Sequence, residues 1–348
     1  MPKCRRLSLP ILPMCRKSNF RWKYMPWIWP RRSGRLFWAR WSLSGRCEMK
    51  KVLVVGTGAL ATLFAARLAA AGSQVMMLGT WKNALEALNR DGARLVTADG
   101  VEMRLPVRAT DDPASCTEID LALVLVKSWQ TEQAAQKLSV GLPASALAVT
   151  LQNGLGNREI LARALGEARV LLGVCTYGAT LLGPGLARSG GEGVLSLEAH
   201  PLVGEVECLL RGAGFRVDIV PDANALVWGK LVINAAINPL TALLRVSNGE
   251  LLNRPAARRV MSALAREAAA VAAAGGVNLP FADPVMAVEE VARRTAANCS
   301  SMFQDVKRGA PTEIDSICGA VTRAAQERGV PAPVNWTMWQ LVNALYGS

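Results

Sequence analysis

The chain has 348 residues, of which 51% are hydrophobic, and a formal net charge of +13. At roughly 100–200 residues per domain, this length predicts two domains with ample apolar material for buried cores. No uninterrupted apolar run approaches the ~18 residues that span a bilayer, so the sequence indicates a soluble protein without a membrane partner.

The first 48 residues carry most of the excess charge. They hold 12 of the 40 Lys and Arg residues, five of the ten Trp residues and a single acidic residue. Because the rest of the chain is nearly balanced, we expect the folded body not to bind nucleic acid. We interpret 1–48 as a disordered extension or as sequence upstream of a natural start at Met49. An Arg-rich transit peptide and a basic tail for RNA or a membrane surface are the alternatives.

The cysteines show no pattern of a metal site or a disulfide framework. Three of the eight lie in the extension, and the other five are scattered without a CxxC pair. This usage is typical of a reduced, cytoplasmic protein without a metal. We expect the cysteines of the body to be small buried hydrophobic residues.

The first element after Met49 has the pattern of a dinucleotide-binding unit. Residues 51–55 predict a strand, a glycine-rich turn follows, a helix runs to about residue 71, and 74–78 predict a second strand. In this context the turn predicts phosphate binding at a helix N-terminus. The candidate cofactor residues are Gly56, Thr57, Gly58, Ala59, Leu60 and Ala61.

The end of the second strand predicts the choice of cofactor. NAD-binding folds place Asp or Glu here, on the ribose 2′-hydroxyl. The sequence has Leu78-Gly-Thr-Trp-Lys82 instead, without a carboxylate. Lys82 is a candidate partner for a 2′-phosphate and Thr80 for a hydrogen bond to it, which favours NADP. The alternative is that Lys82 is a solvated charge at the start of the next helix.

Two further predicted strands end in polar residues. The run 120–126 leads into Lys127, and the run 146–151 leads into Gln152 and Asn153. Ligands of open α/β sheets bind outside the carboxyl ends of strands, so Lys127 and Asn153 are candidates to touch cofactor or substrate. Capping or loop roles are the alternatives, above all for Asn153 before a glycine.

Beyond Pro221 helical periodicity replaces weak strands at 169–174, 194–198 and 216–220. We therefore predict an NADP-binding domain at 49–220 and a helical catalytic and substrate domain at 221–348.

In the stretch 228–239, Lys230, Asn234 and Asn238 share one face of an apolar helix. A lysine on such a stripe indicates a functional role, and burial would lower its pKa.

A second polar cluster lies at 298–301 and 312–315, and it includes Ser301 and Glu313. For Glu313 the alternative is compensation of a helix dipole. The single histidine, His200, precedes Pro201 far from these clusters, so we expect a turn residue there. Lys230 is then the candidate proton donor.

Residues 49–348 closely resemble the ketopantoate reductase (2-dehydropantoate 2-reductase) family. The resemblance rests on GTGALA at 56–61, LVKSWQ at 125–130, LQNGLGN at 151–157, WGKLVINAAINPLTAL at 228–243, SNGEL at 247–251, and SSMFQDV and TEID between 300 and 315.

The resemblance implies an α/β fold, with an N-terminal Rossmann domain and an all-helical C-terminal domain like that of 6-phosphogluconate dehydrogenase. It implies reduction of a 2-keto acid, ketopantoate, to (R)-pantoate by NADPH in pantothenate and coenzyme A biosynthesis. Lys230 matches the proton donor, and Glu313 a residue near the lysine and nicotinamide. Matches to substrate positions are Asn153, Asn234, Asn238, Asn248 and Ser301, and matches to cofactor positions are Lys127, Asn153 and Ala179.

The sequence departs from the family in two places. Thr80 and Trp81 stand where members often carry an Arg for the 2′-phosphate, and Cys318 stands where Asn is common. A paralogous NADP-dependent reductase of another 2-keto acid and a non-catalytic NADP-binding regulator are the alternative functions. A homodimer is an open alternative for the oligomeric state.

Overall fold

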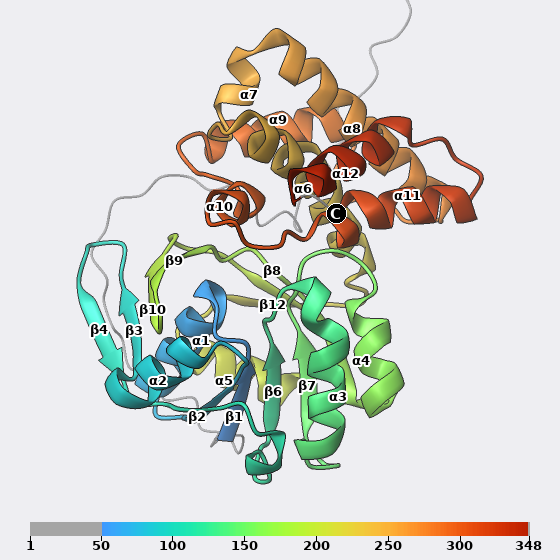
Figure 1. Cartoon of the computed structure of the whole chain (residues 1–348). Coiled ribbons are helices and arrows are strands. Elements are labelled where there is room, and N and C mark those ends of the chain that lie inside the picture. Colours follow the sequence, from blue (N-terminus) through green and yellow to red (C-terminus); the bar gives the residue numbers. More distant parts are fainter. Residues whose placement is uncertain (1–50, 347–348) are drawn as a thin grey trace, which may run out of the picture. The chain divides into compact units, whose positions relative to one another are not determined.

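The computed structural model describes residues 51–346, so the expectations for residues 1–48 lie outside the described residues. Its first part is built on an eight-stranded sheet (Figure 1). The strand order is β12-β11-β8-β7-β6-β1-β2-β5. The strands are β1 (Lys51–Val55), β2 (Gln74–Leu78), β5 (Arg108–Thr110), β6 (Leu121–Val124), β7 (Leu147–Thr150), β8 (Val170–Cys175), β11 (Leu195–Glu198) and β12 (Val217–Val220).

Most neighbouring strands are parallel, and only the β11–β8 pair is antiparallel. The register pairs Val55 with Leu78 on one side and with Val124 on the other. The carboxyl ends of β1, β2, β6 and β7 therefore meet at one edge of the sheet. This edge is where a doubly wound sheet binds its ligands.

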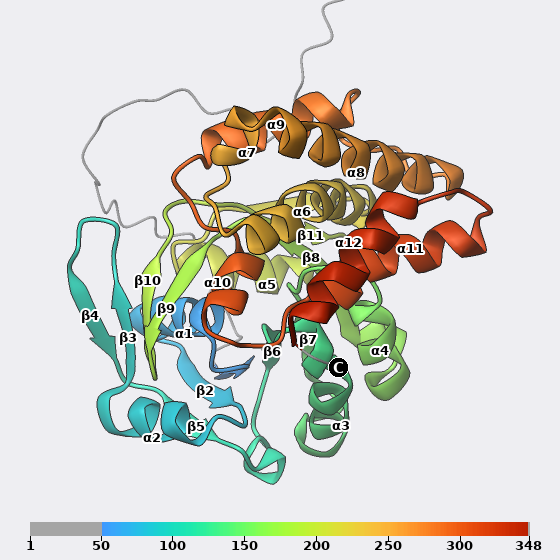
Figure 2. The ribbon, with the colours of Figure 1, turned by 45° about the horizontal axis from the view of Figure 1, so that its top comes forward.

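Helices cover both faces of this sheet (Figure 2). α1 (Ala59–Ala70) and α5 (Val203–Gly212) lie on one face, where Val52 and Val54 share a core with Phe64. α3 (Thr131–Gly141) and α4 (Asn157–Leu165) lie on the other, where Leu53 and Val55 share a core with Leu138. Because both faces are covered, β6 and β7 are buried throughout, as is usual for central parallel strands.

A small second sheet has no counterpart in the sequence-based prediction. Its order is β4-β3-β10-β9, with β3 (Ala93–Val96) and β4 (Glu102–Leu105) forming a hairpin after α2 (Lys82–Asp91). From far along the chain, β10 (Leu186–Ser189) pairs with β3, and β9 (Ala179–Gly183) pairs with β10. The sheet packs against α1, and the start of β9 lines the same cleft as the glycine turn after β1.

Residues 221–346 contain helices and no strand. The predicted fold class, a Rossmann domain followed by a helical domain, is thereby confirmed. The helices are α6 (Asn224–Leu244), α7 (Glu250–Asn253), α8 (Pro255–Ala274), α9 (Pro284–Arg294), α10 (Ser301–Lys307), α11 (Cys318–Glu327) and α12 (Pro333–Asn343).

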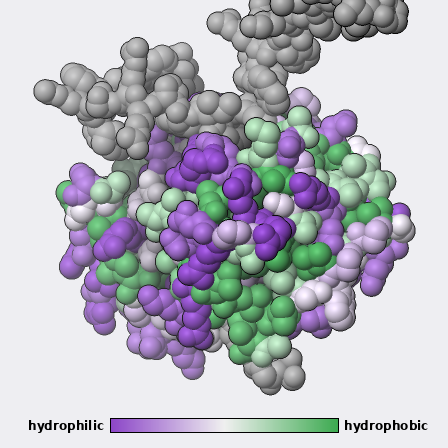
Figure 3. All heavy atoms as spheres, turned by 90° about the horizontal axis from the view of Figure 1, so that it is seen from above, coloured by the Kyte–Doolittle hydropathy of each residue, from purple (hydrophilic) through white to green (hydrophobic). Residues whose placement is uncertain are grey.

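α6 is the central helix of this domain. Within residues 51–346 it is the one helix that is long and apolar enough to cross a membrane by length and composition, but 67% of that window is buried inside the protein. α8, α9, α10 and α12 pack against it. Because of this burial and packing, α6 serves as the core helix of the domain. The face of the molecule shown in Figure 3 mixes hydrophilic and hydrophobic residues.

Pro239 lies inside α6 and has no N–H to donate to the carbonyl of Ala235. The thiol of Cys318, at the start of α11, donates to that oxygen at a sulfur–oxygen distance of 3.8 Å. The departure at Cys318 thus has a structural role, because its weak S–H donor partly satisfies the carbonyl that the proline leaves free.

Candidate active site

The glycine turn after β1 opens directly into a cleft. Gly56 has a φ of +127°, and a Cβ there would lie 3.2 Å from the backbone of Leu125. Gly58 faces open space and begins α1 without a side-chain cap. Since the first turn of α1 also lacks an acidic residue, its backbone N–H groups suit the pyrophosphate of a dinucleotide.

The cleft has a volume of about 1010 Å³ and is lined by both domains. The Rossmann domain contributes the turns after its strands, and the helical domain contributes Lys230 and parts of 295–313. The sequence-predicted residues that line it are Gly56, Thr57, Gly58, Ala59, Leu60, Lys127, Asn153, Ala179, Lys230, Ser301 and Glu313. Those that do not line it are Ala61, Lys82, Asn234, Asn238 and Asn248.

The carboxylate of Glu313, in the helical domain, accepts hydrogen bonds from three groups of the Rossmann domain. Although only 5% of Glu313 is exposed, its two oxygens accept hydrogen bonds from Ser128 N (3.2 Å), Asn153 Nδ2 (3.1 Å) and Lys127 Nζ (3.4 Å). Its side chain caps no helix. Glu313 directly precedes the short 3-10 helix Ile314–Ser316, so compensation of a helix dipole stays an alternative, and its carboxylate also holds the turns after β6 and β7.

Asp305 was missed by the sequence analysis as a residue of this cluster. It is almost completely buried, and its oxygens accept from Lys127 Nζ and Arg308 Nη2, both at 2.7 Å. Burial alone would lower the pKa of Lys127, but the charges and hydrogen bonds of Glu313 and Asp305 outweigh it and raise that pKa. Lys127 is therefore a fixed cation and a poor proton donor.

Lys230 is in the opposite electrostatic situation. Its Nζ donates to the backbone oxygen of Cys175 at 2.5 Å, and it lines the cleft. Desolvation lowers its pKa, and the upward influences of Cys175 and Glu313 do not compensate. Of Lys127 and Lys230, only Lys230 has a lowered pKa, which suits a proton donor.

The other members of the α6 stripe lie deeper. Asn234 is half-buried and Asn238 is buried, so the shared helical face runs from the cleft into the domain. Asn248 lies behind the cleft wall, where its Nδ2 donates to Thr295 Oγ1 at 2.8 Å. Its buried Oδ1 has no hydrogen-bond partner within residues 51–346. A role for these amides in substrate binding stays a prediction.

Ser300 and Ser301, at the start of α10, lie in different environments. Ser300 caps the helix, because its Oγ accepts from Phe303 N at 3.0 Å, and it also accepts from Thr241 Oγ1. Ser301 is exposed and lines the cleft. A contact between Ser301 and the substrate, which the resemblance implies, stays a prediction.

His200 and Cys299 are two further residues with sequence-based expectations. His200 bonds Ala168 O and Leu202 N in a turn outside the cleft, as predicted. The expectation that body cysteines are buried is wrong for Cys299, which is exposed and lines the cleft. Residues 51–346 contain no group of three or more His, Cys, Asp or Glu side chains that could hold a metal ion.

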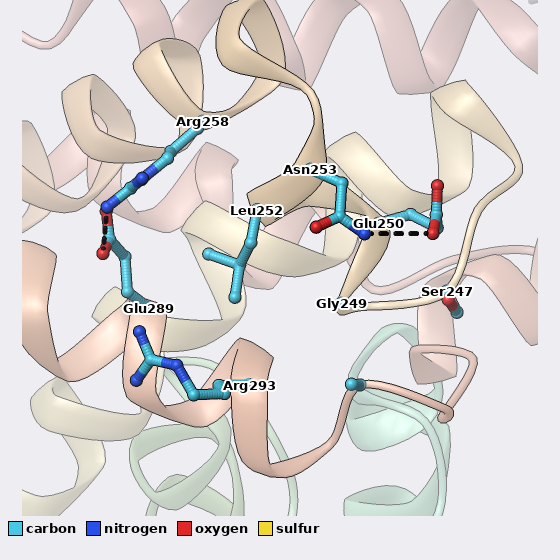
Figure 4. A pocket seen from close by; sticks show the side chains of 9 residues that line it. Ser247, Gly249, Glu250, Leu252, Asn253, Arg258, Glu289 and Arg293 are labelled. Carbon is cyan, nitrogen blue, oxygen red and sulfur yellow. Dashed lines mark hydrogen bonds and ion pairs between the residues drawn. The ribbon is translucent and has the colours of Figure 1, made fainter.

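A smaller hollow of about 420 Å³ lies on the helical domain (Figure 4). Its charged residues are already paired, since Arg258 and Glu289 form two hydrogen bonds of 2.6 and 2.7 Å. Asn253 likewise donates to Glu250. None of the sequence-predicted site residues lines this hollow, and we leave it outside the candidate active site.

Gly154 of the Rossmann domain lies close to the backbone of Ser316. A Cβ at Gly154, whose φ is +84°, would lie 2.4 Å from Ser316 O. We expect Gly154→Ala to lower the free energy of unfolding by more than the roughly 1–2 kcal/mol of left-handed strain alone, and to weaken cofactor binding. Gly156→Ala is the matched control, because Gly156 has a φ of +89° with open space around its Cβ. Equal losses in thermal unfolding of the two variants would contradict the close contact.

Both domains match known proteins. Residues 52–201 match the family described as "Ketopantoate reductase PanE/ApbA", and residues 222–346 match its C-terminal counterpart. Relatives named 2-dehydropantoate 2-reductase include one from Archaeoglobus fulgidus, 38% identical over 86% of this chain and 98% of its own. Another, from Halobacterium salinarum, is 35% identical over 84% of this chain and 97% of its own.

Solved structures show the same fold. A PanE/ApbA family ketopantoate reductase from Ralstonia eutropha has a TM-score of 0.80 and 32% identity, over 85% of this chain and 98% of its own. A D-mandelate dehydrogenase in complex with NADH and anilino(oxo)acetate has a TM-score of 0.79 over 85% of this chain and 98% of its own, but only 23% identity. The likeness to that enzyme therefore concerns the fold alone. Taken with the identities above, these matches mean that the chain belongs to the ketopantoate reductase family of oxidoreductases.

Proposed function

We propose that this protein reduces 2-dehydropantoate (ketopantoate) to (R)-pantoate with NADPH, in the biosynthesis of pantothenate and coenzyme A. The names of the relatives support the substrate. The observation that carries the reaction type is Lys230, which lies in the cleft with a lowered pKa beside a buried carboxylate cluster. A protein that only sensed the cofactor would need no such proton donor.

Bound NADPH would supply the hydride that reduces the keto carbon. The uncapped N-terminus of α1 and the turn at Gly56 and Gly58 would hold its pyrophosphate. Lys230 would stabilise the charge that develops on the carbonyl oxygen and then give it the proton on Nζ. Glu313 would keep the turns that carry Lys127 and Asn153 at the correct distance from the reacting groups.

The test is the oxidation of NADPH, followed at the nicotinamide absorbance, with ketopantoate and a panel of other 2-keto acids, and again with NADH. We expect the highest kcat/KM for ketopantoate and a clear preference for NADPH. Reduction of another keto acid with ketopantoate inert would identify a paralogous reductase with the same mechanism. No turnover with any of these acids would contradict the proposal.

The pH dependence should follow Lys230. Only its protonated form can donate, so the rate of keto-acid reduction is expected to fall as pH rises through the lowered pKa. Oxidation of the hydroxy acid by NADP⁺ needs the neutral amine, and it should become faster over the same range. Initial rates in both directions from about pH 6 to pH 10 would measure this. A reduction rate that stays constant across this range would contradict the assignment.

We further propose a cytoplasmic location, which the free thiols of the five described cysteines favour. Light scattering of the purified protein would show whether it forms the homodimer that the sequence left open.

A further inference from the structure

One end of the cleft has a chemistry that the glycine turn and Lys230 do not explain. The turn after β2 contributes Gly79, Thr80 and Trp81 to its lining. In a Rossmann fold this position lies beside the adenosine ribose of the bound dinucleotide. A second wall of the cleft is α3, which contributes Gln133, Ala134 and Lys137. These two walls therefore define where an adenosine group would lie.

Lys137 is the one charged residue that the β2 turn and α3 contribute to the lining. Its Nζ donates to the backbone oxygen of Asp111 at 2.8 Å, in the loop after β5. The Lys137 side chain therefore reaches from α3 to the loop after the edge strand β5. An ammonium has three N–H donors, so two remain for a ligand. No carboxylate from these two walls lines the cleft to accept a ribose 2′-hydroxyl.

Lys82, the candidate from the sequence, lies elsewhere. It is exposed at the first position of α2 and is not part of the cleft lining. The two lysines are thus a matched pair for comparison. Both carry a positive charge close to the same turn, but only Lys137 faces the cleft.

Trp81 adds an aromatic surface at the same end. It lines the cleft, and 39% of its surface is exposed. A flat indole at the adenosine end is suited to stack on a purine base, and such stacking does not depend on the 2′ substituent. Trp81 would therefore favour both nicotinamide cofactors to the same extent.

We propose that Lys137 pairs with the 2′-phosphate of the cofactor and that Trp81 stacks on its adenine. This rests on the proposed use of NADPH. The selectivity for the phosphorylated cofactor then comes from α3, and the turn after β2 contributes only general affinity for the adenosine group.

The experiment measures binding of adenosine 2′,5′-bisphosphate and of AMP to the full chain by titration calorimetry. We expect Lys137→Gln to weaken binding of the bisphosphate about tenfold or more and to leave AMP unchanged, because only the former loses a charge-assisted hydrogen bond. Trp81→Ala should weaken both compounds by a similar factor, about fivefold or more. Lys82→Gln should change neither.

Two outcomes would overturn the inference. One is a selective loss of bisphosphate binding in Lys82→Gln with Lys137→Gln unaffected. The other is an equal loss of both compounds in Lys137→Gln, which would show a structural role through Asp111. KM values for NADPH and NADH in the same variants provide a second readout, and thermal unfolding checks that each variant is folded.

Failure of the proposed function is distinguishable from failure of this inference. A wild-type protein that binds AMP and the bisphosphate equally would contradict the NADPH preference itself. A wild-type protein that prefers the bisphosphate, and keeps that preference in Lys137→Gln, would contradict only the role of Lys137.

Discussion

Replacing Lys230 with Ala is expected to lower the turnover of keto-acid reduction by roughly 10³-fold or more, with NADPH binding retained. The loss is large because one side chain both stabilises the forming alkoxide and donates its proton. Binding should persist because the glycine turn and the adenosine end of the cleft are untouched. Steady-state rates and the fluorescence of bound NADPH would measure the two effects separately.

Lys230→Arg is the informative companion. It keeps a positive charge on α6, but a guanidinium does not give up its proton in this pH range. We expect it to remain nearly as inactive as the alanine variant. Recovery of most of the activity in Lys230→Arg would show that the charge alone matters, and it would remove Lys230 as the proton donor.

The second large effect is expected for Glu313→Gln. Glu313 holds Lys127, Ser128 and Asn153 and also raises the pKa of Lys230 by its charge. The variant should therefore lose roughly tenfold to a hundredfold in kcat, because the turns that it holds relax. In addition, the pH at which reduction declines should move further down. A pH–rate profile of the variant tests both.

Asp305→Asn is the matched control for that shift. Asp305 also pairs with Lys127, but it is not among the groups that influence the pKa of Lys230. In this variant, the rate of keto-acid reduction should fall at the same pH as in the wild-type protein. If both variants moved the decline equally, Glu313 would act only through the general packing of the domain interface.

The parts of the site that the sequence predicted are encoded locally. The run from Val55 to Ala61 has a strand, a glycine turn and a helix start in consecutive residues, so its geometry follows from neighbouring positions. The helical spacing of Lys230 and Asn234 on α6 is equally local. The termini of β1 and β2 lie where the sequence placed them for the same reason.

The parts that were missed depend on residues far apart in the chain. β10 is a short strand whose partner β3 lies about ninety residues earlier, and no periodicity in the sequence predicts such a pairing. Asp305 lies within the segment SSMFQDV that resembles the family, but its partner Lys127 is 178 positions away. Likewise, the folded chain and not a local pattern determines that Lys137 lines the cleft and Lys82 does not.

The uneven burial of the thiols offers a route to site-specific labelling. Burial raises the pKa of the Cys116, Cys175 and Cys318 thiols, which protects them from alkylation. Cys208 is half-buried, whereas Cys299 is exposed in the wall of the cleft. A chain expressed from Met49 also lacks the three cysteines of the extension. A fluorescent maleimide is therefore expected to attach first at Cys299 in the cleft wall, where it would report ligand binding without any engineered cysteine.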